Sequence, residues 1–490
     1  MSPKLLLIPI LLPILAGAMM YVRHEKLFRF RNAYALAAVC LNSCMVWCLI
    51  LFCKEVKFEI FRLTQTIALT LRFDPLGRFF AGLIATLWPL TTLYAIGYMR
   101  HEHHRILFFS FFLMSYGVTM GVATAGNMIT LYCFYEMLTL STVALVIHPM
   151  TDEAVRAARQ YVIYSIGGAA FAFIGIMYLS ANGLSLDFIL GGSISSSTQA
   201  PQNIGLFIYV MTFLGLSVKA AIFPFHDWLP KASVAPTPVT ALLHAVAVVK
   251  AGAFAVIRLT YYVYGARILA GTWAQTLVMG LAAFTVVYGS AKAVKQTHWK
   301  RRLAYSTVSN LSYILFGATL MTQAGMAAAL LHMLFHAIIK ILAFFCAGCV
   351  LHMTGRKYLH ELDGLARKMP VTFATFTVSA LSLTGIPPLT GFVSKFQLLA
   401  AASQTELPMA YVGMGALLVS ALLTAIYMFT AVVRAYFPAK DADLSGLDNV
   451  READKVMLVP MVIIAAAVVL FGLFAGPFVQ LTRSIASGIF

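Results

Sequence analysis

The chain has 490 residues, of which 61% are hydrophobic and 11% charged, whereas a soluble domain is about 45–50% apolar and about 25% charged. Apolar runs of about 20 residues, long enough to cross a ~30 Å hydrocarbon core as a helix, recur from end to end. The composition therefore predicts an all-α polytopic membrane protein and excludes a large soluble domain. In a soluble protein the formal net charge of +17 would suggest a nucleic-acid partner, so the positions of the charges decide its meaning.

Fourteen apolar runs, separated by polar loops, are the predicted membrane spans. The first lacks the basic segment of a signal peptide beyond Lys4, so we expect it to be a transmembrane helix and not a cleaved signal. Between the second and third runs, EVKFEIFRLTQTIALTLRFD is rich in β-branched and aromatic residues and predicts a short extramembrane β-hairpin. The predicted spans are 4–22, 33–53, 77–99, 105–124, 127–148, 157–180, 203–225, 237–263, 270–290, 302–322, 324–352, 371–402, 409–437 and 456–482.

The predicted spans divide the chain into four parts. Residues 1–104 hold three helices and the hairpin, 105–263 and 270–437 hold five helices each, and 438–490 hold a cytoplasmic loop and the last helix. Because five is odd, a duplication of five helices places the second copy upside down in the membrane, an arrangement known in transporters. We therefore expect two inverted five-helix repeats, although the two segments share no clear residue-level similarity.

Lysine and arginine are distributed unevenly between alternate loops. The set that contains RHEKLFRFR, RHEHHR, KQTHWKRR and GRKYLHELDGLARK holds 22 of them, and the termini with the other loops hold 8. By the positive-inside rule the first set is cytoplasmic, and an even number of spans puts both termini on the opposite side. The charge thus reflects topology in a prokaryotic-type inner membrane, and no nucleic-acid partner is needed.

The sequence shows no sign of a redox centre. Cys346 and Cys349 form a C-x-x-C inside an apolar helix, and we interpret them as small buried residues in preference to redox or metal ligands. The seven cysteines do not have the spacing of an iron–sulfur site, and we find no nucleotide loop or haem motif. We therefore predict no cofactor and no metal.

Charged residues inside the spans are the main functional signal. Glu136 is the one acid near the middle of a predicted span, and taken alone it fits a protonated packing residue as well as a functional one. One carboxylate cannot neutralise four lysines, so some lysines must lie beside water or give up their proton part of the time. We expect Arg258, near a helix end, to snorkel. The five basic residues inside spans are Lys219, Lys250, Arg258, Lys340 and Lys395.

Two of these lysines lie beside predicted helix breaks. Lys219 stands five residues before Pro224 in LGLSVKAAIFPFHDWLP, and Lys395 stands seven residues after Pro388 in LTGIPPLTGFVSKFQLL. Proline in a span frees main-chain carbonyl groups, which is tolerated where the break lines a wet or protein-filled cavity. The breaks fall in the seventh and twelfth spans, which correspond in the two expected repeats.

A row of titratable residues lies in HMLFHAIIKILAFF. His332, His336 and Lys340 recur every four residues and form a stripe about 12 Å long on a helix. Side chains one turn apart are about 6 Å from each other, so a water chain must complete their contacts. Alone, the stripe fits three satisfied core residues or a metal-binding face equally well.

Three further residues are candidates whose role the sequence leaves open. His244 lies six residues before Lys250, so the two point to different faces of one helix. His226 and Asp227 follow the break of the seventh span and fit either an entry point or an ordinary loop pair.

Together these residues resemble a known family, the antiporter-like membrane subunits shared by respiratory complex I, Mrp-type cation/proton antiporters and group 4 membrane-bound hydrogenases. The resemblance covers essentially the whole chain. The chain is similar to the shorter, fourteen-helix members, which lack a lateral C-terminal helix. The most specific stretches are FYEML, VKAAIFPFHDWLPKASVAPTPVTALLHAVAVVKAG, HMLFHAIIK and LTGIPPLTGFVSKF.

The resemblance implies a proton-translocating subunit with a hydrated chain of ionisable residues at its centre. It implies an ion pair between Glu136 and Lys219, and redox chemistry or ion exchange in partner membrane subunits, including further antiporter-like ones. The expected relay consists of Glu136, Lys219, Lys250, His332, His336, Lys340 and Lys395, with His226 and His244 as additional candidates.

Two alternatives remain. One is a Na⁺/H⁺ antiporter subunit of an Mrp-type complex, although one mid-span carboxylate is a poor site for a hard cation and favours protons. The other is a scaffold with a silent channel, against which the full occupancy of the relay positions argues.

Overall fold

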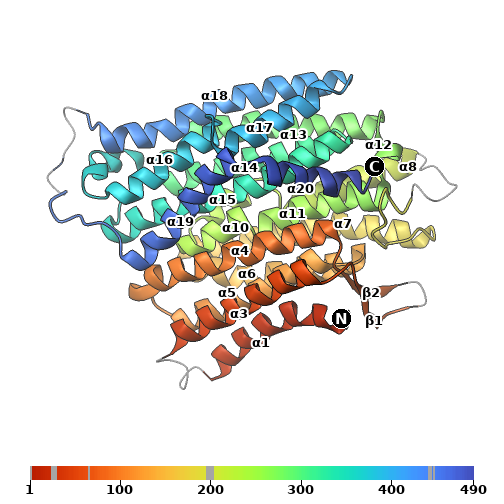
Figure 1. Ribbon diagram of the computed structural model, residues 1–490, viewed down its shortest axis with the longest axis horizontal. Helices are drawn as coiled ribbons and strands as arrows, with labels where there is room; N and C mark the ends of the chain where they lie inside the picture. The colour runs from red at the N-terminus through yellow and green to blue at the C-terminus, as the bar shows by residue number, and fades with distance from the viewer. Residues whose placement is uncertain (1–2, 24–29, 65–66, 195–202, 440–443, 445–446) are drawn as a thin grey trace.

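A computed structural model describes residues 3–23, 30–64, 67–194, 203–439, 444 and 447–490. Long helices lie side by side, and a small sheet and both termini lie at one end of the bundle (Figure 1). Within these residues, eleven helical segments are long and apolar enough to cross a membrane, as predicted for a polytopic all-α protein. They are Pro3–Val22, Arg31–Phe52, Pro75–His101, Arg105–Thr124, Met128–Val146, Asp152–Ala181, Thr237–Tyr264, Trp273–Lys295, Gln323–Thr354, Pro408–Tyr436 and Lys455–Leu473.

Polar side chains begin many helices of the bundle. Each accepts a hydrogen bond from a main-chain N–H of the first turn, which otherwise lacks a partner. The helices are α4 (Pro75–Tyr98), α6 (Met128–Val146), α7 (Asp152–Ala181), α13 (Trp273–Lys295), α14 (Trp299–Thr319) and α15 (Gln323–Thr354), and their caps are Asp74, Asn127, Thr151, Thr272, His298 and Thr322.

Three other predicted spans are helical as well. One is α14, which starts three residues earlier than predicted and carries Lys300, Arg301 and Arg302 in its first turn. The other two are the predicted broken helices, and both breaks are confirmed. α8 (Asn203–Ser217) ends before Lys219, and turns lead to the short α9 (Trp228–Ala232).

The second break separates α16 (Pro370–Thr384) from α17 (Thr390–Ser403). Gly385 ends α16 with φ of 95°, a conformation that side chains with a Cβ rarely adopt. Gly391 lets α17 begin against α16, because a Cβ there would lie 1.7 Å from the main-chain oxygen of Ser382. The peptide bonds Phe223–Pro224 and Pro387–Pro388, one in each break, are cis.

A third break was not predicted. The span Thr237–Tyr264 consists of α10 (Thr237–Ala245), α11 (Val248–Arg258) and a π-helical turn, Leu259–Tyr264. Val246 and Ala247 between α10 and α11 are not helical, and neither is a proline or a glycine. The break therefore carries no sequence signal, yet it puts Lys250 in the first turn of α11.

The β-hairpin is confirmed. β1 (Lys57–Arg62) pairs antiparallel with β2 (Ala68–Arg72), with an irregularity between Glu59 and Phe61. The main-chain N–H of Thr70 donates to the hydroxyl of Thr130 at 2.8 Å, which ties the hairpin to the start of α6.

The C-terminal span is shorter than predicted. α19 ends at Leu473, and a separate helix, α20 (Gly476–Ser487), follows and packs against α15. The predicted range 456–482 was wrong at its end because Gly476 and Pro477 start a new helix there, in line with the preference of proline for a first turn.

Candidate functional site

The pair of Glu136 and Lys219 joins α6 to the first break. The Lys219 amine lies 3.4 Å from the Glu136 carboxylate and also donates a short hydrogen bond to the main-chain oxygen of Tyr135. It lies over the Tyr135 ring, 3.4 Å from the centroid. Lys219 is fully buried, while the Glu136 side chain is 24% exposed. The pair thus reaches from the interior to the outer surface of the chain.

Lys250 meets the row of α15 directly. Its amine lies 2.5 Å from Nδ1 of His336, and both side chains are buried. One of the two atoms must donate and the other accept, so this contact already holds a proton between two bases. Lys250 also lies at the N-terminus of α11, where the helix dipole disfavours a positive charge.

α11 also approaches Lys219 closely. A Cβ added at Gly252 would lie 2.6 Å from the Ala220 nitrogen and 2.9 Å from the Lys219 carbonyl carbon. The absence of a side chain at Gly252 therefore brings the backbone that carries Lys250 against the backbone that carries Lys219.

His332 connects the row to the second break. Its Nδ1 lies 3.0 Å from the hydroxyl of Ser394, the residue before Lys395 on α17. The rings of His332 and His336 are stacked with centroids 5.8 Å apart, and Tyr313 stacks on His332 at 5.2 Å. Among the described residues, no group hydrogen-bonds to Nε2 of either histidine. A buried ring nitrogen of this kind is a natural site for water.

Lys395 lies in α17 and reaches across the second break. Its amine donates to the main-chain oxygens of Leu383 at 2.5 Å and Thr384 at 3.2 Å, at the end of α16, and lies 5.4 Å from the centroid of the Tyr313 ring. Main-chain oxygens accept from a charged or a neutral amine, so these contacts do not fix the charge of the lysine.

Lys340 points elsewhere. Its amine donates to the main-chain oxygen of Leu303 on α14 at 3.0 Å. Within the described residues, no hydrogen bond joins it to Lys250 or Lys395. The residue is buried near the predicted relay, but its contact leads away from the second break.

The two additional histidines differ in their surroundings. His244 is fully buried, its ring lies 4.7 Å from that of Phe344, and neither ring nitrogen has a hydrogen-bond partner in the described part of the chain. His226 packs against the rings of Phe223 and Tyr288. Its neighbour Asp227 forms an ion pair with Lys231 at 2.5 Å.

The prediction for Arg258 was wrong. Arg258 is fully buried and donates two hydrogen bonds, of 2.5 and 2.6 Å, to the carboxylate of Asp74, which is buried too. It does not snorkel because this bidentate pair, with Gly77 N–H donating to Asp74 at 2.8 Å, satisfies the charge inside the protein. The sequence feature that could have pointed to this ion pair was Asp74 itself, an acid directly before α4.

Sequence reasoning also missed several polar residues. Lys300 and Arg302 were assigned to a loop, but they are buried in α14, where Lys300 donates to the Ala235 oxygen at 2.7 Å. Ser394 and Tyr313 contact the relay residues without being titratable near neutral pH. Only the position of Ser394 beside Lys395 could have pointed to it.

Cys346 and Cys349 are free and buried, as interpreted from the sequence. The Cys346 sulfur lies 3.4 Å from the Thr375 hydroxyl, and that of Cys349 lies 3.8 Å from the Tyr94 hydroxyl. In the described residues, no three His, Cys, Asp or Glu side chains are grouped so that they could hold a metal ion.

The fold and the row of buried bases define a polytopic membrane protein of antiporter-like type. The family described as "NADH:quinone oxidoreductase/Mrp antiporter, TM" matches residues 125–424, and the chain belongs to this family. The predicted resemblance and the predicted class, an antiporter-like membrane subunit, are thereby confirmed.

Two sequence relatives show the breadth of the family. NADH-quinone oxidoreductase subunit N of Desulforudis audaxviator is 34% identical over 416 residues, which cover 82% of this chain and 81% of that protein. Na(+)/H(+) antiporter subunit A1 of Staphylococcus haemolyticus is 32% identical over 440 residues, 85% of this chain and 53% of that protein. The chain thus spans about half the length of the antiporter subunit.

Two solved structures share the fold over the whole chain. A chain of the Mrp complex from Dietzia sp. superposes with a TM-score of 0.85 at 20% identity, and a chain of the membrane-bound sulfane sulfur reductase, an archaeal respiratory membrane complex, with 0.87 at 23%. Each match covers 100% of this chain and 98% of the other. Both neighbours are parts of membrane complexes, and the similarity establishes the fold of this chain.

Proposed function

We propose that this chain moves protons as one subunit of a multisubunit membrane complex, which is complex I-like, Mrp-like or of the membrane-bound hydrogenase type. Its partners are other membrane subunits, including further antiporter-like ones. One observation carries the proposal: Lys219, Lys250, Lys340 and Lys395 are buried, but only Lys219 pairs with a carboxylate among the described residues. His336 contacts Lys250, and His332 contacts Ser394 beside Lys395. Structural ion pairing does not require three lysines without an acid, whereas a proton relay does.

The first step of the proposed mechanism takes place at Glu136 and Lys219. Glu136 holds Lys219 in its charged form, and because Glu136 is partly exposed, a neighbouring subunit can loosen the pair. Lys219 then releases its proton toward Lys250. Moving one charge against 100 mV requires about 2.3 kcal/mol, less than the about 3–5 kcal/mol lost when a buried pair is broken.

The second step follows the contacts of α15. The proton passes from Lys250 to His336 through the 2.5 Å contact, and from there to His332, Ser394 and Lys395. Water must join the stages that side chains do not bridge, and the unpartnered Nε2 atoms of the two histidines support its presence.

The inverted repeats 105–263 and 270–437 and the cytoplasmic side of the basic loops belong to this proposal. In support, each broken helix carries a lysine that donates to a main-chain oxygen. Single cysteines introduced between α6 and α7 (147–151) and between α7 and α8 (182–194) test the orientation. Only the first should react with an impermeant thiol reagent added from the cytoplasmic side.

The experiment is proton uptake by proteoliposomes that contain the assembled complex. We expect Lys219→Ala, Glu136→Gln and Lys250→Met to lower coupled uptake more than about tenfold, because proton transfer by a positioned group contributes about 10²–10⁴-fold. Lys231→Met is the matched control, since Lys231 lies beside the same break in an exposed ion pair. Uptake that stays intact in Lys219→Ala or Glu136→Gln would contradict the relay.

Exchange of Na⁺ for protons is the second candidate, because a Na(+)/H(+) antiporter subunit is among the relatives. A hard cation prefers several oxygen ligands, whereas the row offers amines and imidazoles, so the site favours protons. Transport that depends on external Na⁺ would support the alternative. A silent scaffold would leave all relay variants with normal uptake.

A further inference from the structure

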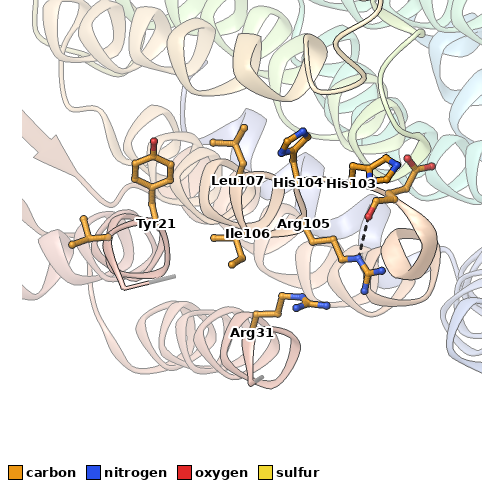
Figure 2. Close-up of a pocket in the computed structure, with 9 residues that line it drawn as sticks. Tyr21, Arg31, His103, His104, Arg105, Ile106 and Leu107 are labelled. Carbon is orange, nitrogen blue, oxygen red and sulfur yellow. Dashed lines mark hydrogen bonds between the residues drawn. The ribbon is translucent and has the colours of Figure 1, made fainter. Parts of the chain in front are cut away.

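A cavity outside the relay lies at the end of the bundle that the sequence predicts to be cytoplasmic. It has a volume of about 800 Å³ and lies between the end of α1 (Ile8–Val22), the start of α3 (Arg31–Phe52) and the start of α5 (Arg105–Thr124). Figure 2 shows its lining side chains. This volume is within the range of about 300–1,000 Å³ of small-ligand sites. The lining residues are Tyr21, Val22, Arg31, Glu102, His103, His104, Arg105, Ile106 and Leu107.

The polar lining is mainly basic. It consists of two arginines, two histidines and one acid, Glu102. Arg105 donates hydrogen bonds to the main-chain oxygens of Glu102, at 3.1 Å, and Arg100, which leave its charge uncompensated. No described acid lies within ion-pair distance of Arg105. The charges of Arg31 and Arg105 also repel each other, and an anion between them would relieve that repulsion.

The remaining lining is apolar apart from the Tyr21 hydroxyl, and part of it is exposed at the surface of the chain. Ile106 and Leu107 form the wall on the side of α5 (Figure 2). Tyr21 is 57% and Val22 75% exposed, and tyrosine is typical of the interface between membrane and water. A ligand that fits both parts has a negative head and an apolar body.

We infer that this cavity binds the phosphate headgroup of an anionic phospholipid from the cytoplasmic leaflet. Basic pockets between transmembrane helices on the cytoplasmic side are suited to such headgroups. Arg31 and Arg105 hold the phosphate, and the acyl chains leave over Val22 along the apolar outer faces of α1 and α3. The site does not involve the relay. Only its assignment to the cytoplasmic leaflet rests on the orientation included in the proposed function, and the lipid-binding test below does not depend on it.

The test uses the purified full-length chain, stripped of lipid in detergent and titrated with a short-chain phosphatidylglycerol or the matching phosphatidylcholine. We expect preference for phosphatidylglycerol, and a loss of affinity of about 30-fold in the double variant Arg31→Gln/Arg105→Gln, the effect of two basic residues near an anionic surface. Arg451→Gln, which removes an exposed charge that does not line the cavity, should bind like the wild type.

The double variant Arg31→Lys/Arg105→Lys distinguishes loss of charge from loss of folding. It should keep most of the affinity, and thermal unfolding of all variants reports their integrity. Equal phosphatidylglycerol affinity in the wild type and the glutamine variant would overturn the site. Displacement of the lipid by an equal concentration of inorganic phosphate would also overturn it. A third contrary result would be no lipid binding together with cross-linking of the cavity to an acidic segment of a partner subunit.

Discussion

The buried pair of Asp74 and Arg258 allows a quantitative prediction. Arg258→Met removes two hydrogen bonds, of 2.5 and 2.6 Å, and leaves the Asp74 carboxylate buried with the Gly77 N–H, at 2.8 Å, as its one remaining partner among the described residues. Breaking a buried ion pair by removing one partner destabilises a protein by about 3–5 kcal/mol. The unfolding equilibrium constant should therefore rise by between two and four powers of ten, since each factor of ten corresponds to about 1.4 kcal/mol.

The assay is unfolding of the full-length chain in mixed micelles, followed by tryptophan fluorescence. Arg62→Met serves as the control, because Arg62 pairs with Glu59 at 2.7 Å on the surface, where such pairs contribute about 0–1 kcal/mol. Adding Asp74→Asn to Arg258→Met should restore most of the stability, because asparagine still caps α4 and carries no charge. If Arg258→Met unfolds no more easily than Arg62→Met, the pair does not stabilise the fold as argued.

Two further predictions concern packing and pH. Gly252→Ala should lower the thermal midpoint by an amount that corresponds to about 1–3 kcal/mol, because its Cβ would lie 2.9 Å from the Lys219 carbonyl carbon. Gly280→Ala is the control and should be neutral, because its Cβ would meet only the flexible Met409 side chain at 3.6 Å. Burial, with nearby positive charges, lowers the pKa of His298 to about 4. The unfolded chain then binds more protons between about pH 6.5 and 4, so the contribution of His298 to stability is complete above 6.5 and is lost as the pH falls toward 4. His298→Asn keeps an acceptor for the start of α14 and should lose less thermal stability between about pH 7 and 5 than the wild type; an equal loss would contradict the assignment.

The features that the sequence predicted well are those with a local cause. The two proline-containing breaks have such a cause, since proline cannot continue a helix, and α8 and α16 end before Pro224 and Pro388. The hairpin β1–β2 also follows from local composition. Long apolar runs predict how many spans there are, but the polar residues at each edge can belong either to the helix or to a loop. For this reason α14 begins earlier than predicted.

Features with a distant cause were missed. Arg258 and Asp74 are 184 residues apart in the chain, so no local pattern joins them. The break at Val246 and Ala247 has no proline or glycine, and only the packing of α10 and α11 against other helices can determine it. For the candidate site, the identity of the residues was predictable because charge in a membrane span is rare, but their partners depend on tertiary packing.

The row on α15 shows what that packing adds. Helical periodicity placed His332, His336 and Lys340 on one stripe, along which a water chain was expected to complete their contacts. The three side chains instead meet three different elements: His332 contacts α17 at Ser394, His336 contacts α11 at Lys250, and Lys340 contacts α14 at Leu303.

Because Lys250 contacts the middle residue of the row, a proton in the proposed relay enters α15 at His336, one turn from either end. The contact of His332 leads to the second break and Lys395, while that of Lys340 leads to α14, where Lys300 is also buried. Within the proposal, His336 is therefore a branch point from which two arms lead, one through His332 and one through Lys340. Among the described contacts, only those of the His332 arm reach a residue beside Lys395, namely Ser394. We therefore assign the exit of protons to this arm.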